Sequence, residues 1–156
     1  MEWLRRAISA AGVTTLAVAL MQCGSSGPNA ASSGDAVYAR AFERVVLPVV
    51  ESYAPDLVLV SAGFDASARD PLAQMELSAN AFGWMARELA RLAAGSAGGK
   101  MALVLEGGYD LVALESGLVR AIDGMLADRA DAIVPSDDEG VARAAGWAKK
   151  SWSRVG

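Results

Sequence analysis

The chain has 156 residues, of which 53% are hydrophobic and 21% are charged, and its formal net charge is -4. This composition is that of one globular domain rather than a disordered chain. Because the charge is mildly negative, we expect no nucleic-acid partner, which would require a clustered basic face. The only cysteine, Cys23, excludes an intrachain disulfide. The absence of histidine excludes a histidine base or a histidine-ligated metal site within this chain.

The first 33 residues differ in composition from the rest. No charged side chain lies between Arg6 and Asp35, and an apolar run extends from Ala7 to Met21. A basic start, an apolar run and then small residues are typical of a signal peptide, and Leu20-Met21-Gln22-Cys23 resembles a bacterial lipoprotein cleavage box. The alternatives are a buried helix or a start that is not native to the domain.

We therefore predict two segments: an atypical, signal-like or non-native segment at residues 1–33, and a partial domain at residues 34–156. The expected location is the cytoplasm. Export or membrane anchoring through residues 1–23 is the alternative that the signal-like pattern leaves open.

From Asp35 onward, helical and strand patterns alternate. Apolar residues at helical spacing predict helices, and two continuous apolar runs predict strands buried on both faces, as in parallel sheets. Pro48 is expected to kink the first helix or to open a second one. In chain order, the elements are a helix from Asp35, a short helix to Tyr53, a strand at 57–62, a helix capped by Ser78, a strand at 101–105, a helix capped by Asp110 and a helix at 139–149.

This order predicts an α/β fold with a mostly parallel sheet. Two strands are few, because the mean sheet has about 5–6. We therefore expect the chain to form part of a larger sheet. An apolar strand edge without its neighbour is prone to association.

Two loops follow the strands, at the edge where ligands bind in open parallel sheets. Asp65 lies in the first loop. It could be a metal ligand, a charged anchor for a substrate or a turn cap. Asp70-Pro71 in the same loop is typical of a turn. In the second, Gly107-Gly108 allows close approach of the backbone to a ligand. Tyr109 follows the two glycines. Its two interpretations are a hydrogen-bond donor to a substrate carbonyl and a tyrosine packed at the start of a helix.

The motifs Val60–Ala66, Asp70-Pro71-Leu72 and Leu103–Asp110 resemble those of the histone deacetylase and acetylpolyamine amidohydrolase family. The resemblance covers residues from about Gly34 to Leu126, the C-terminal part of such an enzyme, and leans toward bacterial and class II-like members. It implies an arginase-like, three-layer α/β fold and hydrolysis of N-acetyl amides. The substrate would be an acetyl-lysine protein or an acetylated small molecule such as an acetylpolyamine.

The resemblance also implies roles for the loop residues. Asp65 matches one of three zinc ligands, and Tyr109 matches the catalytic tyrosine that helps zinc to polarise the acetyl carbonyl. Gly107 and Gly108 would line the substrate site. Zinc is the cofactor of the family, serving as Lewis acid and activator of water.

The chain departs from the family pattern because the other two zinc ligands and the paired histidines have no counterpart in it. One aspartate does not make a catalytic zinc site, which normally has three protein ligands. We therefore expect a fragment or truncated gene product that is inactive alone and that associates with a chain carrying the missing N-terminal half. A non-catalytic binding or scaffold module derived from the same fold is the alternative.

Overall fold

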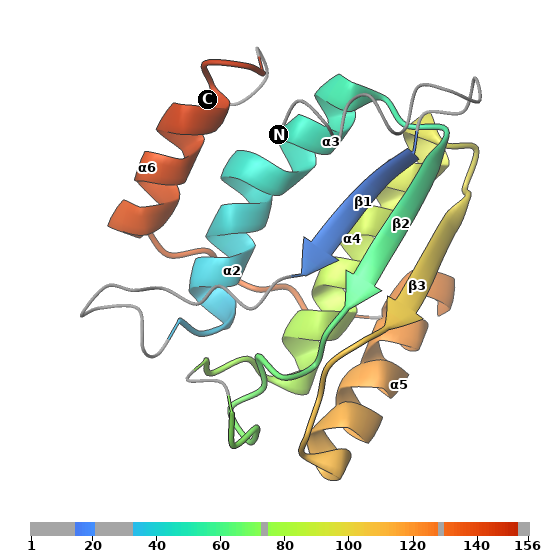
Figure 1. Ribbon diagram of the computed structural model, residues 1–156, viewed down its shortest axis with the longest axis vertical. Helices are drawn as coiled ribbons and strands as arrows, with labels where there is room; N and C mark the ends of the chain where they lie inside the picture. Colours follow the sequence, from blue (N-terminus) through green and yellow to red (C-terminus); the bar gives the residue numbers. More distant parts are fainter. Residues whose placement is uncertain (1–14, 21–32, 73–74, 128–129, 153–156) are drawn as a thin grey trace.

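The computed structural model describes residues 15–20, 33–72, 75–127 and 130–152 (Figure 1). Within these ranges no helix is both long and apolar enough to cross a membrane. In chain order, the elements are β1 (Thr15–Leu20), α2 (Asp35–Ala41), the π-helix η2 (Phe42–Val46), α3 (Leu47–Tyr53), β2 (Leu57–Ala62), α4 (Ala79–Ser96), β3 (Met101–Leu105), α5 (Leu111–Ala127) and α6 (Glu139–Ala148).

The described strands form one parallel sheet in the order β1-β2-β3. β2 lies between its neighbours, so that Val60 is paired with Val18 on one side and with Leu103 on the other. The prediction of an α/β fold with a parallel sheet is therefore confirmed. The expectation of two strands was wrong, because β1 is a third.

β1 lies inside the apolar run that resembled a signal peptide or a buried helix. Its sequence, Thr15–Leu20, includes the β-branched residues Thr15 and Val18, and pairing with β2 supplies the partner that a short apolar run needs to form a strand. Composition alone did not distinguish these outcomes, because a short apolar run fits a strand or a helix equally. The rest of the signal-like segment, residues 1–14 and 21–23, lies outside the described residues, and the boundary at residue 33 stays a prediction.

The sheet is covered by α4 and α5 on one side, as Figure 1 shows. Val58, Val60 and Ala62 of β2 are buried in the core, and the residues between them are half-buried. In β3, Val104 and Leu105 are 48% and 54% exposed. The expectation that both strands are buried on both faces was therefore wrong. Among the described residues, β3 has a neighbouring strand on one side only and a helix layer on one face.

Pro48 lies in the first turn of α3, which ends at Tyr53 as predicted for the second helix. This helix does not start afresh, because Phe42, Val46 and Leu47 keep helical φ and ψ angles and α2, η2 and α3 are continuous. The backbone reaches it from α2 through the wider π-turn of η2 rather than through a loop. Sequence predicted that the proline would interrupt the first helix, and the interruption takes the form of π-helical turns just before it, which have no signal of their own in the residue pattern.

Two glycines allow α4 and α5 to pack closely. A Cβ on Gly83 of α4 would lie 2.9 Å from the carbonyl oxygen of Arg120, and one on Gly124 of α5 would overlap the carbonyl oxygen of Gly83. The hydrophobic core on the inner side of these helices includes Phe82, which stacks against Phe64 with ring centroids 4.9 Å apart. The packing of α4 on α5 thus supports the start of the loop that follows β2.

Candidate active site

The two loops that follow β2 and β3 continue the hydrogen-bonded ladder beyond the strands. The N–H of Glu106 donates to the carbonyl of Ala62 at 3.1 Å, and the N–H of Phe64 donates to the carbonyl of Gly107 at 2.8 Å. Both loops lie at the carboxyl end of the parallel strands, the usual position of ligand sites in such sheets. The structure therefore brings the predicted loops side by side.

Asp65 is 4% exposed, although it carries a carboxylate. Its side chain lies against the glycines of both loops. A Cβ on Gly63 would be 3.0 Å from Asp65 Oδ1, and one on Gly107 would be 3.2 Å from Oδ2. The absence of side chains at these glycines therefore makes room for the buried carboxylate. Sequence reasoning expected Gly107 to let the backbone approach a ligand, and the group it approaches within this chain is Asp65.

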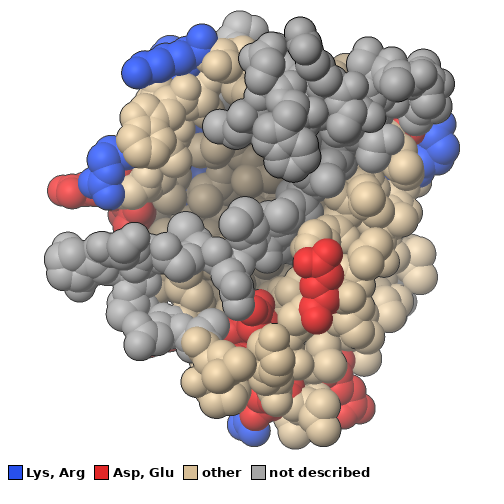
Figure 2. All heavy atoms as spheres, viewed as in Figure 1, with Lys and Arg blue, Asp and Glu red and all other residues tan. Residues whose placement is uncertain are grey.

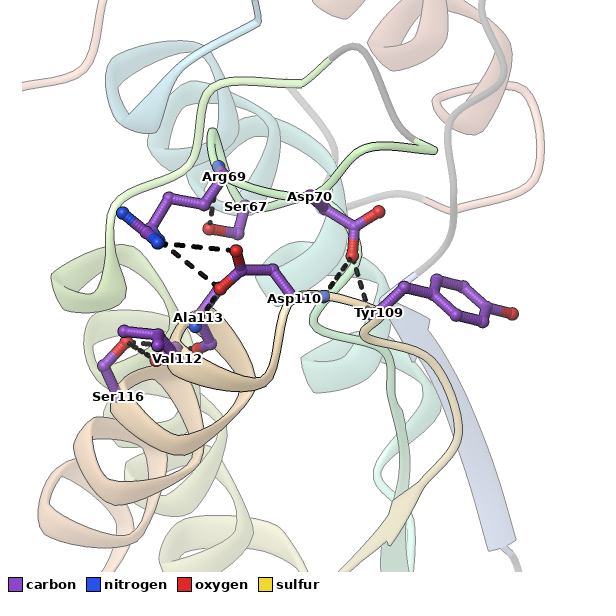
Figure 3. A network of polar contacts seen from close by, with 8 residues as sticks. All are labelled: Ser67, Arg69, Asp70, Tyr109, Asp110, Val112, Ala113 and Ser116. Carbon is purple, nitrogen blue, oxygen red and sulfur yellow. Dashed lines mark hydrogen bonds and ion pairs between the residues drawn. The ribbon is translucent and has the colours of Figure 1, made fainter.

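Gly108 adopts a backbone conformation that requires glycine. Its φ angle is 135°, and a Cβ there would lie 3.2 Å from both Phe64 Cβ and Leu114 Cδ1. The next residue, Tyr109, is 61% exposed. Figure 3 shows its ring projecting away from the neighbouring polar network while its backbone nitrogen faces that network. The tyrosine is therefore presented outward and is not packed in the core.

Asp110 caps the N-terminus of α5 and also joins the two loops. Its Oδ1 accepts a hydrogen bond from the N–H of Ala113 at 2.8 Å, as the predicted helix cap, and the Arg69 guanidinium contacts the same carboxylate at 3.4 Å. The Ala113 hydrogen bond, followed by the bond and charge of Arg69, lowers the pKa of Asp110 below its ordinary value. Because Arg69 is largely exposed, this ion pair is screened by solvent.

Asp70 is the residue that sequence reasoning underestimated. Its Oδ1 accepts from the N–H of Leu72 at 2.9 Å, which is the predicted turn. Its Oδ2 also accepts from the N–H of Tyr109 at 2.7 Å, across the gap between the two loops (Figure 3). No local sequence signal announces a contact between residues 39 positions apart. Its position before Pro71 is equally explained by the turn alone.

The described residues do not by themselves fit a zinc site. Among them, no group of three histidine, cysteine, aspartate or glutamate side chains is placed to hold a metal ion. The full sequence also contains no histidine. A catalytic zinc normally has three protein ligands, so Asp65 alone is insufficient. Within this chain, the loops offer a buried carboxylate and an exposed phenol but no Lewis acid and no histidine base.

One hollow among the described residues lies away from these loops. It has a volume of about 270 Å³ and is bordered by α2, η2 and α6, with Arg40, Arg44 and Asp138 among its lining residues. A small space of about 10 Å³ lies between the sheet and the helices, with Gly63 and Phe64 among its lining residues. Figure 2 shows more acidic than basic side chains over the lower part of the face, where Figure 1 places the two loops.

Comparison with known proteins gives consistent results. The family model described as "Histone deacetylase domain" matches residues 12–125. Human histone deacetylase 7 is 42% identical over 109 residues, which cover 69% of this chain and 11% of that protein. Histone deacetylase 6 of Caenorhabditis elegans is 43% identical over 83 residues, which cover 53% of this chain and 8% of that protein. The chloroplastic histone deacetylase 14 of Arabidopsis thaliana is 35% identical over 101 residues, covering 65% and 24%.

Solved structures show the same fold. The histone deacetylase Clr3 superposes with a TM-score of 0.72 and 30% identity, over 81% of this chain and 21% of Clr3. The HD domain of HDA15 superposes with a TM-score of 0.70 and 32% identity, over 80% of this chain and 35% of the HDA15 chain. The chain therefore has the arginase-like deacetylase fold, the class of α/β protein that the parallel sheet indicated.

The chain belongs to the histone deacetylase family, a family of zinc-dependent deacetylases. The match begins at residue 12, so the expectation that the resemblance starts near Gly34 was wrong. β1 lies inside the matched region, although its short apolar sequence carries none of the family's loop motifs. The chain spans no more than 24% of the length of the three curated relatives named above. Those relatives are eukaryotic, and the expected leaning toward bacterial members stays a prediction.

Proposed function

We propose that this chain contributes part of the active site of a deacetylase that hydrolyses N-acetyl amides. In this proposal Asp65 is a zinc ligand, Tyr109 is a catalytic hydrogen-bond donor, and Gly107 and Gly108 line the substrate site. One observation carries the proposal. The buried carboxylate of Asp65 lies against Gly107, and the exposed Tyr109 follows two positions later in the chain. All four residues lie in the loops at the carboxyl ends of the parallel strands β2 and β3, where ligands usually bind in such sheets.

The chemistry assigned to this chain is electrostatic. When the acetyl carbonyl is attacked, negative charge develops on its oxygen, and the Tyr109 hydroxyl can donate a hydrogen bond to it. Zinc in the family supplies Lewis acidity and activates water. Asp65 would be its only ligand from the described residues. The 156 residues include no histidine to complete the metal site or to remove a proton from water.

We therefore predict that the chain alone has no deacetylase activity and that the missing groups come from residues outside this sequence. Association with a chain carrying the missing N-terminal half would supply them. The exposed Val104 and Leu105 of β3 support this, because an apolar strand beside an open edge favours pairing with further structure. The substrate would be an acetyl-lysine protein or an acetylated small molecule, and the predicted location is cytoplasmic.

The second candidate is a non-catalytic binding or scaffold module that keeps the fold without the chemistry. The observation behind it is the lack of histidine in an otherwise ordered loop edge. An exported or lipid-anchored form of this module is tested by membrane fractionation. If all of the chain is found uncleaved and outside the membrane fraction, the exported or lipid-anchored form is contradicted.

The first experiment measures deacetylation of an acetyl-lysine peptide by the purified chain, with zinc added. We expect no turnover above background, and turnover that a chelator abolishes would contradict the predicted inactivity. The second experiment replaces the matching part of the HDA15 HD domain by residues 12–125 of this chain. In a folded chimera, the variant Asp65→Asn should lower the zinc content.

In the same chimera, Tyr109→Phe should leave the zinc content unchanged and reduce turnover by about 100-fold or more, as expected for loss of one oxyanion donor. Glu115→Gln on the exposed side of α5 is the control, and both quantities should remain unchanged. Full activity of folded, zinc-loaded Tyr109→Phe would contradict the proposed role of Tyr109. A folded, zinc-loaded chimera with no turnover even when Tyr109 is intact would support the binding-module candidate instead.

A further inference from the structure

Asp70 joins the two loops through the backbone of Tyr109. Its side chain is buried, with only 6% of the residue exposed. Oδ1 accepts from the N–H of Leu72 at 2.9 Å, and Oδ2 accepts from the N–H groups of Tyr109 at 2.7 Å and Asp110 at 3.4 Å (Figure 3). One carboxylate therefore receives hydrogen bonds from the loop after β2 and from the loop after β3.

A carboxylate suits this position because it only accepts hydrogen bonds and offers sites on both oxygens. The bond to the Tyr109 N–H is short, as is typical when one partner is ionised. An asparagine at Asp70 would keep one oxygen and present an amide N–H₂ in place of the other. It would then satisfy the Leu72 N–H or the Tyr109 N–H, but not both.

Tyr109 has few other means of being held in place. Its side chain is 61% exposed and projects away from the polar network. It follows Gly107 and Gly108, which have no side chains to anchor the backbone. The direction in which the ring leaves the chain therefore depends on how the Tyr109 backbone is fixed, and the hydrogen bond to Asp70 fixes it.

We propose that Asp70 is the positioning residue of Tyr109 and aims its phenol outward from the loop edge, before any metal or partner is present. The catalytic meaning of this role rests on the proposed function. The hydrogen-bonded connection does not, because it is complete within this chain. Arg69 and Asp110 reinforce the same junction from the exposed side, through their contact of 3.4 Å.

The first measurement is amide hydrogen exchange of the full chain, resolved by residue with NMR. In the wild type, the amides of Tyr109 and Asp110 should exchange more slowly than unprotected amides. In Asp70→Asn, we expect their exchange to accelerate by about tenfold or more, since bonds to charged groups are among the strongest. The α4 amides should stay protected. Unprotected Tyr109 and Asp110 amides in the wild type would overturn the proposal without any variant.

The second measurement follows the tyrosine side chains by ¹⁹F NMR after labelling with 3-fluorotyrosine. The chain has three tyrosines, Tyr38, Tyr53 and Tyr109, and the spectrum of Tyr109→Phe assigns the third signal. In Asp70→Asn, the Tyr109 signal should shift, while the signals of the half-buried residues Tyr38 and Tyr53 should stay in place. A general loss of structure would move all three signals. Asp138→Asn, which alters the cap of α6, is the control and should move no signal of Tyr109.

A Tyr109 signal that stays in place in folded Asp70→Asn would overturn the positioning role. Neither measurement uses zinc or an acetylated substrate. Failure of this proposal would therefore leave the proposed deacetylase function standing, and inactivity of every chimera would leave the positioning role standing.

Discussion

The loop edge of the sheet, residues 63–72 and 106–110, contrasts with the outer side of β3 and α5. At the loop edge, the carboxylates of Asp70 and Asp110 accept hydrogen bonds from backbone N–H groups within this chain. On the outer side, large apolar side chains face solvent. The most exposed of them, which we call the outer apolar set, are Val104, Leu105, Leu111, Val112, Val119, Ile122 and Leu126.

The difference shows which part of the fold this sequence specifies by itself. Buried polar groups are costly unless they have partners, so the loop edge has to be satisfied inside the chain if it is to form there. Exposed apolar groups cost less in the folded state and gain stability whenever another surface covers them. The loop edge, which carries the candidate residues Asp65 and Tyr109, is therefore preassembled, whereas the outer apolar set is suited to contact with further protein.

The largest expected effect on stability comes from the packing of α5 against α4. Gly124→Ala should lower the free energy of unfolding by about 3 kcal/mol, because the new methyl group would overlap the carbonyl oxygen of Gly83. Gly95→Ala in α4 is the control. Nothing lies within 4 Å of its Cβ position, and the change should stabilise the helix by about 0.5–1 kcal/mol. Equal values for the two variants in urea denaturation would show that α4 and α5 are not packed as described.

A smaller effect is expected within the loop edge. Gly108→Ala should cost about 1–3 kcal/mol, because alanine is strained at a φ of 135° and its methyl group would press on Phe64 and Leu114. Gly99→Ala, at a φ of 78° with no atom within 4 Å, adds strain without the contact. The loss in Gly108→Ala should therefore exceed that in Gly99→Ala, as measured by thermal or urea unfolding. The reverse order would contradict the close approach of the two loops.

The sequence predicted the repeating elements better than the contacts between them. Helices capped by Ser78 and Asp110 and the strand at 57–62 follow from local patterns, because caps and apolar periodicity are properties of neighbouring residues. β1 was missed because a short apolar run has no period of its own, and pairing with β2 decides its conformation. The exposure of β3 was missed because burial depends on which neighbours a strand has.

For the candidate site, the sequence predicted the loops but not their connection. Asp65 and Tyr109 were identified from their place after two strands and from the family motifs. The hydrogen bond from Tyr109 to Asp70 depends on how two distant segments are brought together, and residue spacing contains no information about it. The role of Gly107 was expected to concern a ligand, and only the structure shows that its missing side chain leaves room for Asp65.

The pH dependence of stability provides a finer test of the loop edge. The pKa of Asp110 is lowered from its ordinary value of 3.8 in the folded state. A lowered pKa contributes stability above the ordinary value, and this is lost as the pH falls from there through the folded-state pKa. Unfolding measured between pH 7 and pH 3 should therefore show the wild type losing its advantage over Asp110→Asn at the acidic end. A constant difference across this range would contradict the ionised cap.

The smallest expected effect on unfolding concerns the outer apolar set. The double variant Val112→Ser, Val119→Ser should change the free energy of unfolding by less than about 0.5 kcal/mol for each substitution, because both side chains are more than half exposed. Leu118→Ser, on the side of α5 that packs against the core, is the control and should be clearly destabilising. Sedimentation velocity should show less self-association for the double variant than for the wild type, because less apolar surface is left to cover. If the wild type and the double variant self-associate equally, the outer apolar set is not the surface through which the chain associates. The edge of β3 that has no neighbouring strand among the described residues is then the surface to test next.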